Sequence, residues 1–146
     1  MKEKRKGFHS PLFIQFLYHF NRDRDYYECH EVLEELWMEE GRNPLYQGLL
    51  QVAVGLYHHR NGNVNGARKL FRGALSKLEP FPEDALGIDL SRLQRQAKEY
   101  LERLERFDDA PFGLDVFTIT IVDPVLDEAV EAVARRVGEG KGRQEG

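Results

Sequence analysis

The stretch PLYQGLLQVAVGLYHH, from Pro44 to His59, contains no Asp, Glu, Lys or Arg, although these four residue types make up 32% of the chain. Such a run indicates a helix that is buried on several sides. Asn43 before Pro44 is typical of a helix start, because Asn caps the first turn and proline suits the first helical position. Apolar side chains cover about two-thirds of the helix surface in projection. The remaining stripe consists of Gln47, Gln51, Val54 and His58.

Capping residues, prolines and glycines predict five further helices on either side of this one. Their predicted ranges are Pro11 to about Asn21, Asp25 to Glu40, Asn63 to Glu79, Asp89 to Phe107, and Asp123 to Val137. Short turns between them favour antiparallel packing of neighbours. The sequence therefore predicts an all-α fold, a compact single-domain bundle of about five to six helices over residues 10–137.

One segment breaks the helical period. Residues 116–122, VFTITIV, are β-branched and alternating, so we expect this segment to be extended. A lone strand has no ladder partner within an otherwise helical chain. We expect the segment to lie across the bundle as irregular chain; the alternative is pairing with its own copy in a homodimer.

Composition limits the functions open to the chain. Its 146 residues amount to one domain, and 21 basic against 25 acidic side chains give a net charge of −4, which provides no general attraction to nucleic acid. The apolar runs are far shorter than the roughly 18 residues of a membrane span, so no membrane association is expected. A single cysteine, Cys29, and the lack of a signal peptide favour a cytoplasmic location. Residues 1–9 resemble a mobile basic arm and residues 138–146 a disordered tail.

The helix predicted at residues 25–40 is rich in glutamate, but its charges are not evenly placed. In a projection at 100° per residue, Glu34 and Trp37 fall within about 40° of His30, inside the apolar arc. Glu31 falls at the edge of this arc. The opposite face carries Glu28, Glu35 and Glu39. A buried carboxylate costs several kcal/mol unless it is paired, coordinated or protonated, so Glu34 is expected to have a partner.

The turn near residues 41–43 makes this helix and the uncharged helix antiparallel neighbours. Counting outward from the turn places Glu34 roughly opposite Leu50 or Gln51, and His30 roughly opposite Val54, with His58 about one turn further. The predicted pocket contains Tyr27, His30, Glu34, Trp37, Gln47, Gln51 and His58, with Tyr27 and Trp37 at its two ends. Two histidines and a carboxylate with an open position suit zinc, iron or manganese. His30, Glu34 and His58 are therefore candidate ligands of a divalent transition metal.

Other interpretations of the same residues stay open. A hydrogen-bonded network without any ligand explains them at least as well as a binding site does. The order His30-Glu31-x-x-Glu34 differs from a zinc-protease helix, His-Glu-x-x-His, in its last position, which disfavours that class. We expect His19 and His59 at the surface, and Cys29 as a packing residue rather than a nucleophile.

Three linked segments resemble the uncharacterised bacterial and archaeal family called domain of unknown function 309. The segments are Cys29-His30-Glu31-x-x-Glu34-x-x-Trp37, Tyr46-Gln47-Gly48-Leu49-x-Gln51-x-Ala53 with Tyr57-His58, and Gly62-Asn63-x-x-Gly66-Ala67. The resemblance covers roughly residues 9–78, and Cys29 stands where the family usually has phenylalanine. It implies a compact all-helical bundle, and it implies no activity, because none is established for the family.

Two functional hypotheses follow from the sequence. The first is a helical protein that binds a metal or a small ligand at His30, Glu34, Gln51 and His58; if it is an enzyme, a metal-assisted hydrolase fits these residues, with Gln51 orienting water or substrate. The second is a non-enzymatic protein–protein interaction module whose polar core is purely structural. Its surface would be the acidic face of residues 28–39 or the charged helix from Ser91 to Arg106.

Overall fold

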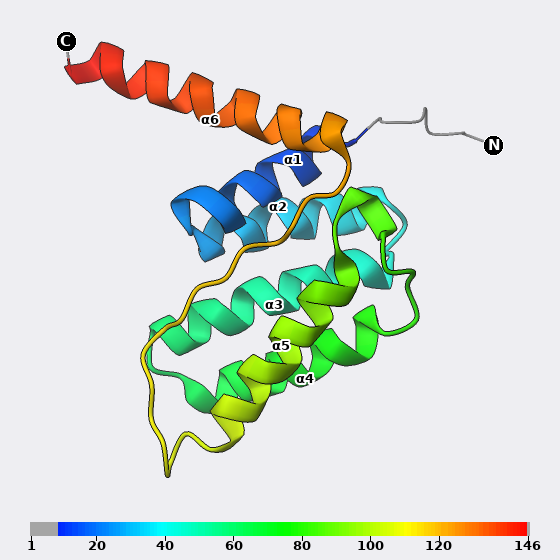
Figure 1. Ribbon diagram of the computed structural model, residues 1–146, viewed down its shortest axis with the longest axis vertical. Coiled ribbons are helices and arrows are strands. Elements are labelled where there is room, and N and C mark those ends of the chain that lie inside the picture. The colour runs from blue at the N-terminus through cyan, green and yellow to red at the C-terminus, as the bar shows by residue number, and fades with distance from the viewer. Residues whose placement is uncertain (1–8, 146) are drawn as a thin grey trace.

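The computed structural model describes residues 9–145, and the side chains of residues 9–140. Figure 1 shows the arrangement of the α-helices, which are α1 (Pro11–Tyr18), α2 (Tyr26–Glu39), α3 (Pro44–Arg60), α4 (Val64–Leu78), α5 (Leu90–Glu105) and α6 (Pro124–Glu145). A π-helical turn, η1 (His19–Asp23), follows α1, and a 3-10 turn, η2 (Ala85–Gly87), precedes α5. The prediction of an all-α bundle of about five to six helices is confirmed.

Side-chain caps explain why the helices begin where the sequence predicts. Each cap accepts a hydrogen bond from a backbone N–H of the first turn, which has no partner inside the helix. Ser10, Asp25, Asn43, Asn63 and Asp89 fill this role for α1 to α5 in turn. The predicted starts are therefore correct to within a residue.

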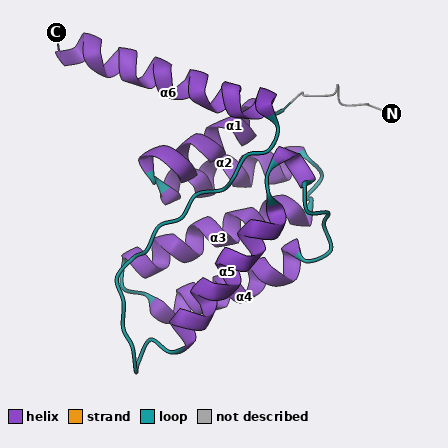
Figure 2. Ribbon diagram, viewed as in Figure 1, coloured by secondary structure: helices purple, strands orange, loops and turns teal. Residues whose placement is uncertain are grey.

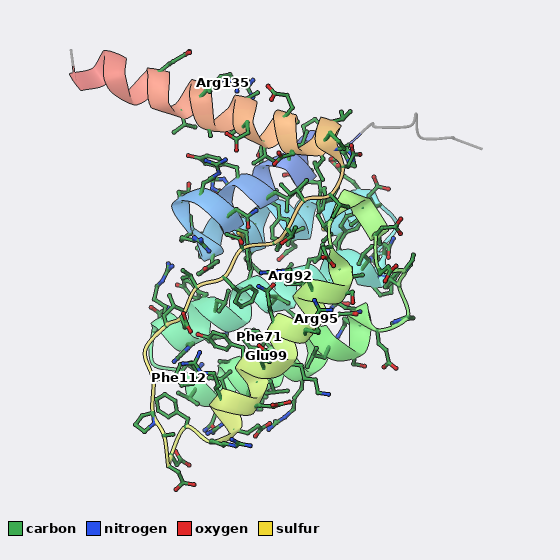
Figure 3. The ribbon with its side chains drawn as sticks, in the orientation of Figure 1. Phe71, Arg92, Arg95, Glu99, Phe112 and Arg135 are labelled. Carbon is green, nitrogen blue, oxygen red and sulfur yellow. The ribbon has the colours of Figure 1, made fainter. Side chains whose placement is uncertain are left out.

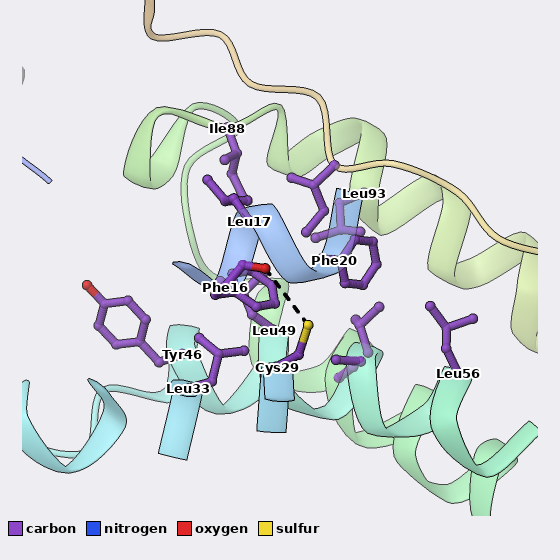
Figure 4. Packing of buried hydrophobic residues seen from close by; sticks show 14 of the residues in the cluster. Phe16, Leu17, Phe20, Cys29, Leu33, Tyr46, Leu49, Leu56, Ile88 and Leu93 are labelled. Atoms are coloured by element: carbon purple, nitrogen blue, oxygen red, sulfur yellow. Dashed lines mark hydrogen bonds between the residues drawn. The ribbon is translucent and has the colours of Figure 1, made fainter. Parts of the chain in front are cut away.

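Helix α3, which carries no Asp, Glu, Lys or Arg before its last residue, Arg60, lies at the centre of the bundle. It packs against α2 on one side and α4 on the other, while α5 packs against α4 and α1 packs against α2 and α6 (Figure 1). Aromatic and aliphatic side chains from α1, α2, α3 and α5 meet in the core, as the close view in Figure 4 shows. Cys29 is fully buried there, its thiol donates to the carbonyl of Phe16 at 3.8 Å, and burial raises the pKa of that thiol. These contacts agree with a packing role for Cys29.

The extended segment forms part of a strap, residues 112–122, that crosses the bundle between α5 and α6 as irregular chain (Figure 2). Among the described residues, its one β-contact is an isolated antiparallel bridge between Ile121 and Ile88. The side chain of Asn21 holds the strap at a second point. Its amide NH₂ group donates to the carbonyl of Ile119 at 2.9 Å, and its amide oxygen accepts from the Ile119 N–H at 2.8 Å. The placement across the bundle is thus as predicted, and the partners of the strap lie within the same chain.

The last helix is longer than predicted. The sequence predicts a disordered tail from Gly138, whereas helix α6 continues to Glu145. Each residue added to an existing helix gains a hydrogen bond without a new nucleation cost, which favours this extension. Of the predicted mobile arm, residues 1–8 lie outside the described residues. His9 is anchored, since its Nε2 lies 2.7 Å from Asp123 Oδ2. Among the described residues, none of the helices is both long enough and apolar enough to cross a membrane.

Candidate functional site

A pocket of about 340 Å³ opens between α2, α3 and α4. We call it the candidate pocket; its lining residues are His30, Glu34, Trp37, Gln47, Leu50, Gln51, Val54, His58 and Leu70. Six of the seven residues predicted from the sequence are in this lining. Helix α4 contributes an apolar wall at Leu70. The sequence-based prediction did not include this wall, because it considered only the pairing of α2 with α3.

The imidazole of His30 lies between two carboxylates of its own helix. Its Nε2 is 3.1 Å from Glu34 Oε2, and its Nδ1 is 3.5 Å from Glu31 Oε1. The side chain of His30 is 35% exposed and that of Glu34 is 54% exposed. The prediction that this pair is buried is therefore wrong. The projection gives the correct face of α2, but Glu34 lies at an open mouth where water still reaches the carboxylate.

Two polar atoms in the lining are buried without a hydrogen-bond partner among the described residues. They are Nε1 of Trp37 and Oε1 of Gln51. The Gln51 amide rests against Gly73 of α4, where an added Cβ atom would lie 2.8 Å from Oε1. A larger residue at position 73 would thus displace the amide, so the glycine leaves room for Gln51 to stay at the pocket wall.

His58 is held from the start of α4. The Asn63 amide lies 3.4 Å from His58 Nδ1, while the same side chain accepts from the Gly66 N–H at 2.9 Å as the helix cap. Because the Asn63 NH₂ group can only donate, Nδ1 accepts, and the neutral ring carries its proton on Nε2. One residue therefore caps a helix and fixes the tautomer of a pocket histidine.

Tyr27, the seventh predicted residue, does not line the candidate pocket. It is 54% exposed, and its ring centroid lies 6.5 Å from that of His30 and 6.2 Å from that of Tyr57. The nearby carboxylate of Glu31 raises the pKa of the Tyr27 hydroxyl. Tyr27 stands beside the pocket mouth and does not close its end as predicted.

The described residues include no group of three His, Cys, Asp or Glu side chains placed to hold a metal ion. His30 and Glu34 lie together, but His58 is engaged with Asn63 at the far end of α3. The predicted triad of His30, Glu34 and His58 is thus not assembled as a three-ligand set in this conformation.

Sequence reasoning missed a second polar cluster. His59, expected at the surface, is 6% exposed, and its Nε2 donates to the carbonyl of Phe112 at 3.0 Å. Its Nδ1 accepts from the hydroxyl of Tyr100, which in turn accepts from the Asp115 N–H at 3.3 Å. Burial raises the pKa of Tyr100 to about 12. The available signal was helical spacing: His59 follows the core residues Val52 and Leu56 by seven and three positions.

Comparison with known proteins links the chain to proteins of unassigned activity. The family model described as "Domain of unknown function (DUF309)" matches residues 13–70, a segment that holds all seven predicted site residues. The uncharacterized protein YpuF of Bacillus subtilis is 34% identical over 132 residues, which cover 87% of this chain and 71% of that protein. An uncharacterized protein of Aquifex aeolicus is 30% identical over 80 residues, which cover 53% of this chain and only 24% of that protein. No solved structure matches the chain. The chain belongs to the DUF309 family.

Proposed function

We propose that the candidate pocket binds a small organic molecule that presents an amine or another N–H donor, carries a hydrogen-bond acceptor as well, and has an apolar body. The volume of about 340 Å³ falls within the range of small-ligand sites, roughly 300 to 1,000 Å³. Leu50, Val54 and Leu70 would contact the apolar body. The polar side chains that line the same space would fix its orientation.

The observation that carries the proposal is the pair of unpartnered polar atoms in the lining. An unsatisfied buried donor or acceptor costs about 1–3 kcal/mol. Trp37 Nε1 needs an acceptor and Gln51 Oε1 needs a donor. An N–H group of a bound molecule would satisfy Gln51 Oε1, and an acceptor oxygen elsewhere on the same molecule would satisfy Trp37 Nε1. This gain supports binding over a purely structural network.

Charge favours a cationic ligand. Glu34 is the one carboxylate in the lining, and no lysine or arginine is among the described lining residues. An ammonium group near Glu34 would gain a charge-assisted hydrogen bond, whereas a phosphate would meet repulsion. A transition metal is less well supported, because the three predicted ligands do not converge. We therefore favour an organic ligand over a metal and its hydrolytic chemistry.

A thermal-shift screen would test the proposal with a panel of primary amines and guanidines beside matched carboxylates and phosphates. A ligand at a hundred times its Kd stabilises the folded state by about 2.7 kcal/mol, which raises Tm by several degrees. We expect at least one amine class to raise Tm, and Glu34→Gln to abolish the shift.

The matched control is Glu35→Gln, which removes the neighbouring carboxylate at an exposed position outside the lining. It should leave the shift intact. A panel in which no amine or guanidine class stabilises the protein, or in which both variants respond equally, would refute the proposed function.

The alternative function, an interaction module, is supported by a different feature, the open groove between α4 and α5. That groove shares no lining residue with the candidate pocket.

A further inference from the structure

An open groove of about 660 Å³ runs between α4 and α5. We call it the α4–α5 groove; its lining residues are Leu75, Glu79, Ser91, Gln94, Arg95, Lys98, Leu101, Glu102 and Glu105. The half-buried Leu75 and Leu101 are its apolar residues, and the charged residues beside them are exposed. None of these residues lines the candidate pocket, so the two surfaces can be tested separately.

The charges that α5 contributes to this groove are segregated along the helix. Arg95 and Lys98 lie in the first half of the lining and Glu102 and Glu105 in the second. Glu105 pairs with Arg72 of α4 at 2.6 Å. Lys98 and Glu102 form no ion pair within the part of the chain that the structure describes. Figure 3 shows Arg92, Arg95 and Glu99 along the same helix.

We propose that a second copy of this chain occupies the α4–α5 groove, with the two α5 helices antiparallel about a two-fold axis near position 100. Positions 98 and 102 are equidistant from residue 100, and so are positions 95 and 105. An antiparallel pair centred there brings Lys98 of one copy to Glu102 of the other, and Arg95 to Glu105. A two-fold contact repeats each pair, which gives four oppositely charged contacts around Leu101 of both copies.

The charge pattern favours a second copy over another occupant. A uniformly acidic or basic peptide would face like charge along one half of α5, which costs affinity. A copy of the same helix in the antiparallel direction meets opposite charge along both halves. Glu79 of α4, at the Ser91 end of the groove, adds one carboxylate near Arg95 and leaves this polarity in place.

Sedimentation equilibrium of the full chain from about 5 to 500 μM, at low and at 0.5 M salt, would test the proposal. We expect a monomer–dimer equilibrium that weakens with salt. Lys98→Glu and Glu102→Lys should each raise the dimer Kd by about tenfold or more, because each places like charges face to face. The double variant restores both pairs, so its Kd should return to within about threefold of the wild-type value.

Matched controls lie on the same helix outside the groove. Arg92→Glu and Glu99→Lys make the same charge changes at exposed positions that are not in the lining, and both should leave the Kd unchanged. All six positions named in these variants and pairs are exposed, and circular dichroism would verify folding. A chain that stays monomeric over the whole concentration range would overturn the proposal, even if a different protein were found to bind the groove. A double variant whose dimer Kd is as high as that of the weaker single variant would overturn it as well.

Discussion

At the scale of single residues, the neighbours His58 and His59 show how one helical step separates two roles. His58 faces the candidate pocket and receives one long hydrogen bond from Asn63. His59 points into the core and satisfies both ring nitrogens, one with Tyr100 and one with the Phe112 carbonyl. The Phe112 carbonyl can only accept, so the neutral ring of His59 carries its proton on Nε2. Its Nδ1 accepts a hydrogen bond from the Tyr100 hydroxyl.

We predict that His59→Leu lowers the free energy of unfolding by about 2 kcal/mol, because the Phe112 carbonyl and the Tyr100 hydroxyl both lose a partner inside the protein. Tyr100→Phe should cost about 1–2 kcal/mol. The double variant should cost less than the sum, since the two side chains share one hydrogen bond. Urea unfolding of the four proteins measures this. His58→Leu, at the neighbouring half-buried position, is the control, and a loss as large as that of His59→Leu would contradict this prediction.

At the scale of elements, the helices followed from the sequence because their signals are local. A cap and a proline act within one turn, so Asn43 with Pro44, and Asp89 alone, mark helix starts without knowledge of the rest of the chain. The same locality explains why the projection of α2 gave the correct face for His30 and Glu34. The projection could not give the exposure of these side chains, because exposure depends on how much of that face α3 and α4 cover.

The strap could be predicted as extended but its partners could not, since they are distant in the sequence. Asn21, which bonds both backbone groups of Ile119, lies 98 positions away. Arg24 donates to the Phe117 carbonyl at 2.7 Å, from a backbone with φ of 58° just after η1. The π-helical turn and this left-handed residue direct both side chains toward the strap. No short sequence motif predicts that Asn21 and Arg24 contact the strap.

We predict that Asn21→Ala destabilises the protein by about 2 kcal/mol, because the N–H and carbonyl of the buried Ile119 both lose their partner. Exchange of the Ile119 amide hydrogen should accelerate more than that of Asp89, whose N–H is held by the Thr120 carbonyl at 2.8 Å. Asn21→Asp keeps the acceptor and should protect Ile119 partially. Unchanged exchange at Ile119 in Asn21→Ala would mean that Arg24 and the Ile88–Ile121 bridge hold the strap by themselves.

At the scale of the whole molecule, α6 is joined to the bundle through a small set of contacts. Leu126 and Val130 are buried against the core, and Arg22 forms an ion pair with Glu131. At the start of α6, Asp123 meets His9 and the turn at Gly87. Gly87 has φ of 77°, and a Cβ atom there would lie 2.9 Å from the Asp123 Cβ, so only glycine fits. A residue from the start of the domain, His9, and one from the middle of the chain, Gly87, thus meet at Asp123.

This convergence predicts an acid-sensitive attachment of α6. Two hydrogen bonds lower the pKa of Asp123 below its usual value of 3.8. The one from His9 has the larger effect, and the one from the Val125 N–H at 2.9 Å has the next largest. The folded protein therefore binds this proton less tightly than the unfolded chain does. The stabilisation is present above the unfolded pKa and is lost as pH falls through the folded pKa.

We expect the free energy of unfolding to fall as the pH drops below about 4, and to fall less steeply in Asp123→Asn, which has no proton to bind at this position. Asp127→Asn removes a carboxylate from the same turn of α6 and serves as the control. NMR titration of the Asp123 carboxyl in His9→Ala would supply the direct readout, with its pKa shifted upward once the leading hydrogen bond is gone. Equal acid slopes in wild type and Asp123→Asn would show that the junction of α6 carries no such dependence, and that the loss of stability in acid arises elsewhere in the bundle.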